Sequence, residues 1–230
     1  MEISTFNRFA FYFLPAQESQ LGRFGAAWLG WSIDKGVVTP FPDPVSHFHN
    51  EMIAQAGKYG FHATLKPPFR LHEDTSIEDL IETATSVIAD IDHFELPPLM
   101  LDQMDDFFVL RTKIDCPAIN NLAQTLVTKL DGFRARPFDE ELRRRRSAGL
   151  SERQEELLLA WGYPFVDDEF RFHLTLTNRC DQLNVAEIDD ILKKHIVPEM
   201  LAPMKVTDVG FVGEAEDGRF HLIKRIPFGH

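Results

Sequence analysis

Two histidines and two threonines stand in the same five-residue pattern, Phe-His-x-Thr-Leu, at two places in the chain. The first copy spans Phe61–Leu65 and the second Phe172–Leu176, so the motif histidines, 62 and 173, lie 111 positions apart. Both copies lie in apolar, β-prone surroundings, and alternate residues of a strand share one face. Each His should therefore point to the same side as its Thr. Two such strands would present two imidazoles and two hydroxyls to one cleft.

This set of side chains suits acid–base chemistry at a phosphorus atom. A neutral imidazole can take a proton from an attacking water while a protonated one gives a proton to the leaving oxygen. Thr hydroxyls can hydrogen-bond the phosphoryl oxygens as charge develops on them. A cyclic phosphodiester fits well, and no metal or other cofactor is required. The near-symmetry of the two copies gives no basis for assigning the base to one His and the acid to the other.

Strand parity and composition suggest further substrate-binding residues. Lys66 lies two residues after the first motif Thr, and Arg171 two residues before the second motif His, so both are predicted to face the cleft. A solvated charge at a strand end is the alternative for each. Tyr12 and Tyr59 are predicted to line the cleft or to pack in the core. Arg143, in a run of four arginines, would bind a second phosphate if its segment folds over the cleft, although such runs are more often solvated helix faces.

The bulk properties exclude several classes of protein. A net charge of −12 argues against a general nucleic-acid binder but not against a local pocket for a small phosphorylated substrate. Cys116 and Cys180 are too few for a disulfide framework or a Cys-based zinc site, and His47 and His49 lack a completing ligand, so we predict no metal site. The sequence has no leader-like start and no apolar run of about 18 residues. It predicts a soluble cytoplasmic protein.

The two halves of the chain repeat one order of elements: strand, helix, motif strand, helix. In the first half the patterns predict a strand at 8–14, helices at 18–30 and 45–57, the motif strand at 59–66 ended by Pro67-Pro68, and a helix at 76–91. In the second half they predict a strand at 107–113, a helix at 117–131, the motif strand at 169–177, a helix at 184–196 and a hairpin over 204–228.

This order predicts an α+β fold built by internal duplication. Each unit is too small to bury its own faces, so the two should pack together. We predict a single bilobal domain over 1–230, with lobe 1 at about 1–98, lobe 2 at about 99–230 and a helical, Arg-rich insert at about 133–160. The motif strands would then flank a central cleft.

The paired motifs resemble those of the 2H phosphoesterase superfamily. The resemblance rests on His62-Ala63-Thr64-Leu65 and His173-Leu174-Thr175-Leu176 and extends to the duplicated layout of both halves. It implies a bilobal α+β fold, metal-free phosphodiester chemistry and a central cleft. It also implies that His62 and His173 are catalytic and that Thr64 and Thr175 bind the phosphoryl group.

A closer resemblance covers nearly the whole chain. The segments Arg23–Gly30, Tyr59–Phe69, Trp161–Pro164 and Phe170–Thr177 are similar to those of the DUF1045 group, often labelled phosphonate metabolism proteins. This resemblance implies a role beside carbon–phosphorus lyase pathways, in which a ribosyl cyclic phosphate must be opened. Fold and context do not by themselves fix a substrate.

The leading hypothesis is a metal-independent cyclic phosphodiesterase acting on a small phosphorylated sugar or nucleotide. An RNA-end 2′,3′-cyclic phosphodiesterase or 2′,5′-ligase-like enzyme is the second, as other 2H families imply, although the acidic balance counts against it. A non-catalytic phosphate-binding protein is the third, and intact His and Thr in both copies count against that. A metal hydrolase would lose activity with a chelator, whereas the leading hypothesis predicts no loss. Oligomeric state stays open.

Overall fold

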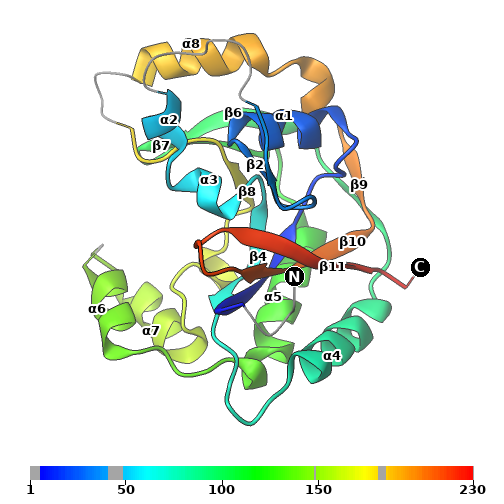
Figure 1. Cartoon of the computed structure of the whole chain (residues 1–230), viewed down its shortest axis with the longest axis vertical. Coiled ribbons are helices and arrows are strands. Elements are labelled where there is room, and N and C mark those ends of the chain that lie inside the picture. The colour runs from blue at the N-terminus through cyan, green and yellow to red at the C-terminus, as the bar shows by residue number, and fades with distance from the viewer. Residues whose placement is uncertain (1–5, 41–48, 148, 181–184, 230) are drawn as a thin grey trace.

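Two antiparallel sheets carry the two motif strands in this computed structural model, which describes residues 6–40, 49–147, 149–180 and 185–229. The first sheet has the strand order β11-β10-β1-β4, and the second has the order β6-β7-β8 (Figure 1). The first comprises β1 (Arg8–Phe13), β4 (Ala63–Phe69), β10 (Asp208–Glu214) and β11 (Phe220–Pro227). The second comprises β6 (Leu99–Met104), β7 (Phe107–Thr112) and β8 (His173–Thr175).

The predicted duplication is confirmed by the pairing of the strands. In each sheet the strand that opens its half pairs antiparallel with the motif strand, β1 with β4 and β7 with β8. The helices follow in the predicted order: α1 (Gln20–Trp28) and α4 (Ile77–Ala89) in the first half, α5 (Pro117–Lys129) and α8 (Val185–His195) in the second. The fold is therefore α+β, as the sequence predicts.

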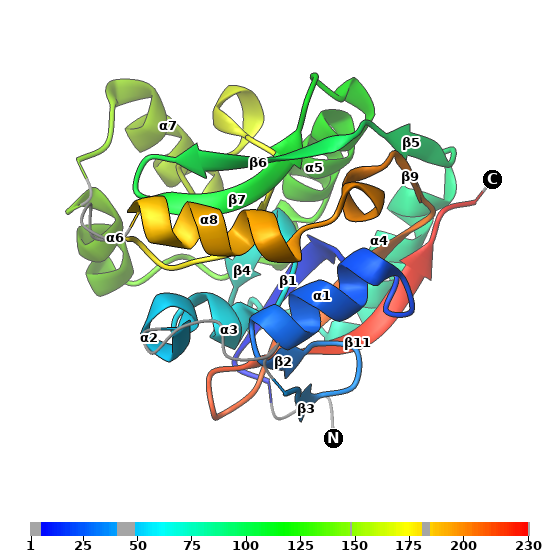
Figure 2. The same ribbon diagram turned by 90° about the horizontal axis from the view of Figure 1, so that it is seen from above.

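The two halves of the sequence do not correspond to the two sheets of the structure. The C-terminal strand β10 pairs with β1, and β11 pairs with β10, so both belong to the first sheet. Helix α5 packs against β4 and α4. In Figure 1, α1 and α8 lie above the central strands and α4 and α5 below them, and Figure 2 shows α1 and α8 nearest the viewer from above. The predicted boundary at 98/99 therefore does not hold for the C-terminal hairpin.

The motif strands differ in length from their predictions. Strand β4 runs through Pro67 and Pro68, which were expected to end it, and this is possible because β4 is an edge strand of its sheet. The second motif strand shrinks from the predicted 169–177 to the three residues of β8. The helix predicted at 45–57 consists of α2 (His49–Ile53) and α3 (Ala56–Tyr59), and its positions 45–48 lie outside the described residues.

The insert is helical, as predicted, and is fastened to the first sheet. It contains α6 (Asp139–Arg146) and α7 (Glu152–Trp161). The Arg70 guanidinium, at the end of β4, lies 3.6 Å from the centroid of the Phe138 ring and 3.6 Å from a carboxylate oxygen of Glu141. These contacts bring α6 to the end of the first motif strand.

The remaining elements are short and connect the larger ones. Strand β2 (Trp31–Ser32) pairs with β3 (Val37–Val38), and β5 (Phe94–Leu96) pairs with β9 (Met204–Val206). In the described part of the chain, turns of 3₁₀ helix lie at Asp131–Phe133, Asp167–Glu169 and Pro198–Leu201.

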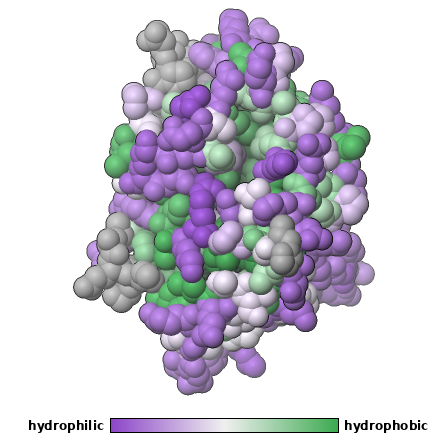
Figure 3. All heavy atoms as spheres, turned by 90° about the vertical axis from the view of Figure 1, so that its right-hand side faces the viewer, coloured by the Kyte–Doolittle hydropathy of each residue, from purple (hydrophilic) through white to green (hydrophobic). Residues whose placement is uncertain are grey.

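A single large apolar core joins the two sheets. Phe9, Phe11 and Phe13 of β1 belong to the same buried cluster as Leu110 of β7 and Leu174 of β8. Within the described ranges, no helix is both long and apolar enough to cross a membrane. On the face seen in Figure 3, hydrophilic side chains cover most of the surface and apolar ones gather in recesses between them.

Candidate active site

The two motif strands lie against each other although they belong to different sheets. Strands β4 and β8 are in contact, and the rings of Phe13 and Phe172 meet edge to face with centroids 5.5 Å apart. The indole of Trp28 donates to the carbonyl of Leu176 at 2.8 Å. The side-chain oxygen of Asn178 accepts hydrogen bonds from two backbone amides at the start of α3. The second motif is thus bonded directly to elements of the first half.

Both motif histidines are held by the same local hydrogen bond. Nδ1 of His62 lies 2.9 Å from the carbonyl oxygen of Gly60, and Nδ1 of His173 lies 2.7 Å from that of Arg171. A carbonyl only accepts, so Nδ1 carries the hydrogen in both rings. Each Nε2 is then available as a base when the ring is neutral. In each copy the carbonyl belongs to the residue two positions before the His.

The backbone that orients His62 requires a glycine. Gly60 has a φ of +69°, which side chains of L-residues rarely permit. A Cβ at this position would also approach Cγ1 of Ile33 to 2.4 Å. A glycine at position 60 therefore allows the backbone conformation in which the Gly60 carbonyl accepts from Nδ1 of His62.

The surroundings of the two imidazoles differ. The ring of His62 stacks on that of Tyr12 with centroids 3.8 Å apart, and its Nε2 lies 3.1 Å from the hydroxyl of Thr64. The nearest aromatic ring recorded for His173 is Phe107, tilted and 6.0 Å away. The first imidazole is thus packed between aromatic and hydroxyl groups, whereas the second has a looser aromatic neighbour.

These surroundings keep both rings neutral. Burial lowers the pKa of His62 to about 4, against the opposing hydrogen bond to Gly60, and the charge of His173 lowers it further. Burial also lowers the pKa of His173, and its hydrogen bond to the Arg171 carbonyl opposes this. The effect of His173 on His62 places the two imidazoles within electrostatic reach of each other.

Each motif threonine follows its histidine by two positions. Thr64 stands opposite Tyr12 across β1–β4, and Thr175 stands opposite Val109 across β7–β8. Both are half-buried, as are His62 and His173. His62 directly precedes β4 and His173 is the first residue of β8, so the two copies stand at the starts of two strands that touch.

Lys66 is not at the cleft, so the prediction from strand parity was wrong. Thr64 opposes Tyr12, whereas Lys66 opposes Phe11, the very next residue of β1, so β4 holds one extra residue here. This bulge turns Lys66 to the core face, where its side chain is 2% exposed and donates to the carbonyl of Val127 at 3.1 Å. Burial lowers the pKa of Lys66 to about 8.

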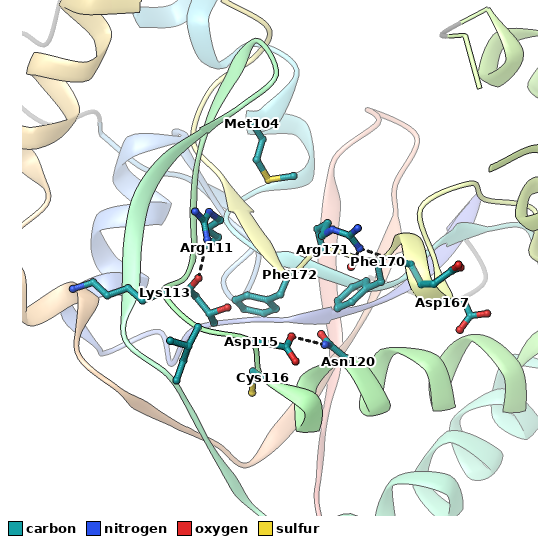
Figure 4. A pocket seen from close by; sticks show the side chains of 13 residues that line it. Met104, Arg111, Lys113, Asp115, Cys116, Asn120, Asp167, Phe170, Arg171 and Phe172 are labelled. Atoms are coloured by element: carbon teal, nitrogen blue, oxygen red, sulfur yellow. Dashed lines mark hydrogen bonds between the residues drawn. The ribbon is translucent and has the colours of Figure 1, made fainter. Parts of the chain in front are cut away.

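Arg171 is exposed and lies in a cavity beside the second motif strand. Its guanidinium donates to the carbonyls of Asp168 and Phe170 at 2.7 and 2.8 Å. The cavity, of about 590 Å³, also receives Arg111, Lys113 and the ring of Phe170 (Figure 4). Arg171 thus lines a cavity that it shares with Arg111, the residue opposite His173.

Sequence reasoning missed Arg111, which stands directly opposite His173 across β7–β8. Its guanidinium forms an ion pair with Asp102 of β6. The residue lies within a predicted strand, but no sequence signal indicated which residue it would oppose, because register depends on the pairing of distant strands.

Of the two predicted tyrosines, only one is at an accessible position. Tyr12 is fully buried, and its hydroxyl has no hydrogen-bond partner among the described residues, so it packs in the core, which was one of the two predicted alternatives. Tyr59 is half-buried, with its ring stacked on Phe220 at 5.2 Å and facing His62 at 6.2 Å.

Arg143 lies on α6 and lines a cavity of about 580 Å³ together with Arg8 of β1. Its Nε donates to the carbonyl of Asp139 at 3.3 Å. Sequence reasoning did not single out Arg145, two positions further on, whose guanidinium lies over the ring of Tyr163 at 4.7 Å. In the described part of the chain, no three His, Cys, Asp or Glu side chains cluster as a metal site would require.

Comparison with known proteins gives a family and several relatives. The DUF1045 family model, described as a protein of unknown function, matches residues 64–221. A protein of Janthinobacterium sp. (strain Marseille), named ribose 1,5-bisphosphate phosphokinase PhnN, is 34% identical over 238 residues, covering 96% of this chain and 51% of its own length. A protein of the same name from Laribacter hongkongensis (strain HLHK9) is 32% identical over 178 residues, covering 77% and 42%. The chain thus spans about half the length of the curated relatives it matches.

Solved structures also show some similarity. Escherichia coli LigT complexed with 3′-AMP aligns with a TM-score of 0.47 and 17% identity, covering 97% of this chain and 99% of LigT. A crystal structure described only as a phosphoesterase aligns with a TM-score of 0.44 and 17% identity, covering 97% of this chain and 99% of its own.

Proposed function

The chain belongs to the DUF1045 family, whose description assigns no activity, and we propose from its site that it is a metal-independent cyclic phosphodiesterase. The observation that carries the proposal is the matched placement of two neutral imidazoles. Each is fixed through Nδ1 to the carbonyl two residues before it, and each has a Thr two residues after it. The substrate class is a small cyclic phosphate of a phosphorylated sugar or nucleotide.

His62 is proposed as the general base. Its low pKa keeps Nε2 unprotonated at neutral pH, so Nε2 can take a proton from the attacking water. The hydrogen bond from Nδ1 to the Gly60 carbonyl then stabilises the imidazolium that forms. The hydroxyl of Thr64, 3.1 Å from Nε2, is placed to turn toward a phosphoryl oxygen.

His173 is proposed as the general acid. A bound phosphodiester carries a negative charge, which raises the pKa of a neighbouring imidazole and favours its protonated form. The protonated Nε2 then gives its proton to the leaving oxygen as the cyclic ester opens. Thr175 is proposed to bind the other face of the phosphoryl group. The products are a phosphate monoester and a free hydroxyl, so one water is consumed and no cofactor takes part.

The relatives support a sugar phosphate as the substrate. Their shared name places a ribose bearing two phosphates in their chemistry, and the sequence resembles a group often labelled phosphonate metabolism proteins. The kinase activity in that name is not extended to this chain, whose sequence has no Gly-x-x-x-x-Gly-Lys-Ser/Thr phosphate-binding motif. We infer a place in phosphonate catabolism, opening a ribosyl cyclic phosphate.

Hydrolysis of a substrate panel in the presence of a chelator tests the proposal. The panel holds ribose 1,2-cyclic phosphate 5-phosphate, nucleoside 2′,3′-cyclic phosphates and an RNA with a cyclic-phosphate end. We expect turnover of a small cyclic phosphate to survive the chelator and to fall by about 10²- to 10⁴-fold in both His62→Ala and His173→Ala. His93→Ala, an exposed His beside Phe228, is the matched control and should keep wild-type activity.

Four results would contradict the proposal. Turnover that the chelator abolishes would require a metal. Wild-type activity in either motif variant would exclude the paired mechanism. No turnover of any compound would favour a binding protein, and preference for the RNA end would favour the second enzyme hypothesis.

A further inference from the structure

A group of polar side chains extends from His62 toward the Arg-rich insert. Arg8 lies on the same face of β1 as Tyr12, the ring on which His62 stacks. The Arg8 guanidinium pairs with the carboxylate of Glu214 at 2.5 and 2.7 Å. The hydrogen bond to Glu214 raises the pKa of Arg8, and the hydroxyl of Tyr59, whose ring lies 6.2 Å from that of His62, raises it further. Arg8 is therefore a fixed cation close to the candidate active site.

Arg145 of α6 approaches this group from the insert. Burial lowers the pKa of Arg145, and the nearby charges of Arg144 and Arg8 lower it further. Its guanidinium lies over the ring of Tyr163, 4.7 Å from the centroid. The insert therefore reaches the Arg8 end of β1. The sequence analysis made a phosphate-binding role of the insert depend on such an approach.

Among the arginines of α6, Arg145 is the half-buried one without a partner for its charge. Arg146 pairs with Glu155 at 2.6 Å, and Arg143 is exposed. Within the described residues, Arg145 forms no ion pair, and its Nε is buried without a hydrogen-bond partner. A buried cation with no counter-charge is costly, so such a group is a candidate for binding an anion.

A cavity of about 580 Å³ lies between Arg8 and α6. It is lined by Arg8, Phe138, Glu140, Glu141, Arg143 and Arg144. Glu141 is engaged with Arg70, 3.6 Å away, so the cavity offers more free positive than negative charge. Its size lies in the usual range of about 300–1,000 Å³ for small-molecule sites.

We propose that the cavity between Arg8 and α6, through Arg143 and Arg144 of its lining and with Arg145 close by on the same helix, binds a second phosphate of the same substrate. The substrate class is then a cyclic phosphodiester that also carries a phosphate monoester. This inference rests on the proposed function of the His62–His173 site. Guanidinium groups suit the role because their planar donors match phosphate oxygens in pairs.

Arg145 is not needed to hold the insert in place. Arg70 joins α6 to β4 through Phe138 and Glu141. Arg134 donates to Asp131 at 2.7 Å and to the carbonyl of Ala160, at the end of α7, at 3.1 Å. A change at Arg145 should therefore act on binding more than on the fold.

The test compares ribose 1,2-cyclic phosphate with and without its 5-phosphate. We expect wild-type kcat/KM to favour the 5-phosphorylated compound by about 100-fold or more, the scale of a lost charge-assisted contact. Arg143→Gln, which removes a guanidinium that lines the cavity, should reduce this ratio by at least about tenfold. Arg146→Gln, on the same helix but paired with Glu155, should keep the wild-type ratio. Arg145→Gln is a second variant, of a guanidinium beside the cavity, in case Arg143→Gln does not fold.

The outcomes separate this inference from the proposed function. Equal turnover of the two compounds by the wild type, or an unchanged ratio in both Arg145→Gln and Arg143→Gln, would overturn the second-phosphate site and leave the phosphodiesterase intact. No turnover of either compound would overturn the proposed function instead. In that case calorimetric binding of ribose 5-phosphate decides the subsite: binding weakened by Arg143→Gln but not by Arg146→Gln supports it, and absence of binding overturns it.

Discussion

The two copies of the His-x-Thr motif share their backbone geometry but not their surroundings. Strand β4 has seven residues and two register irregularities, and an aromatic ring stacks on the His that precedes it, whereas β8 has three residues and a tilted Phe 6.0 Å from its His. Both imidazoles nevertheless donate to the carbonyl two residues back. The short motif thus fixes the local orientation, while the rest of the fold sets the protonation behaviour of each ring. This difference underlies the assignment of base and acid.

The largest effects in this comparison, after those of the histidines, are expected at the threonines. Thr64→Val and Thr175→Val each remove a hydrogen bond to the phosphoryl group and should lower kcat by about 10²-fold. Thr64 also lies 3.1 Å from Nε2 of His62, whereas no bond from Thr175 to a ring is recorded among the described residues. Thr64→Val alone should therefore also shift the acid limb of the pH profile.

Steady-state kinetics against pH checks this difference. Thr85→Val is the control, because the Thr85 hydroxyl bonds only to the Ile81 carbonyl within α4. Equal shifts of the acid limb in both motif variants, or wild-type kcat in either, would contradict the assigned roles.

The pH dependence of wild-type kcat/KM tests the same difference between His62 and His173 directly, and its expected effect is smaller. His62 must be neutral, so kcat/KM should rise as pH increases through about 4. His173 must be protonated, and burial lowers its pKa below the usual value of about 6.5, so kcat/KM should fall as pH rises through that lowered pKa. The optimum is therefore expected on the acid side of pH 6.5. An optimum above pH 6.5 would contradict it.

The smallest effect is expected at Tyr12. Its hydroxyl is buried without a partner, so Tyr12→Phe keeps the ring that stacks on His62 and removes only the unsatisfied group. We expect activity within about twofold of wild type and an unfolding free energy unchanged or raised by up to about 1 kcal/mol. Denaturant unfolding and the standard assay measure both. A tenfold loss of activity would show that the hydroxyl meets the substrate after all.

The sequence predicted the duplicated fold because the pattern depends on local signals. The two motifs, the helix caps and the apolar spacing all act over a few residues. The pairing of the C-terminal hairpin with β1 was missed, because strands so far apart in sequence leave no local sign of their partner. Membership of the DUF1045 family was predicted from four segments and is confirmed by the family model.

One error and one omission at the site have specific physical causes. Strand parity fails at Lys66 because it assumes a regular strand, and a bulge reverses the face of the residue that follows it. Arg145 was not singled out for a different reason. Four consecutive arginines point to all sides of a helix, and only the contact with Tyr163 identifies the one that faces inward.

The most direct test of the central claim is the response of the two His variants to the leaving group. A p-nitrophenyl phosphodiester that the wild type hydrolyses needs no proton on its leaving oxygen, so an acid is dispensable for it while a base is not. We predict that His173→Ala regains most of its lost kcat/KM on this ester relative to a cyclic alkyl phosphate, whereas His62→Ala does not. Recovery in His62→Ala instead, or in neither variant, would contradict the assignment of His62 as base and His173 as acid.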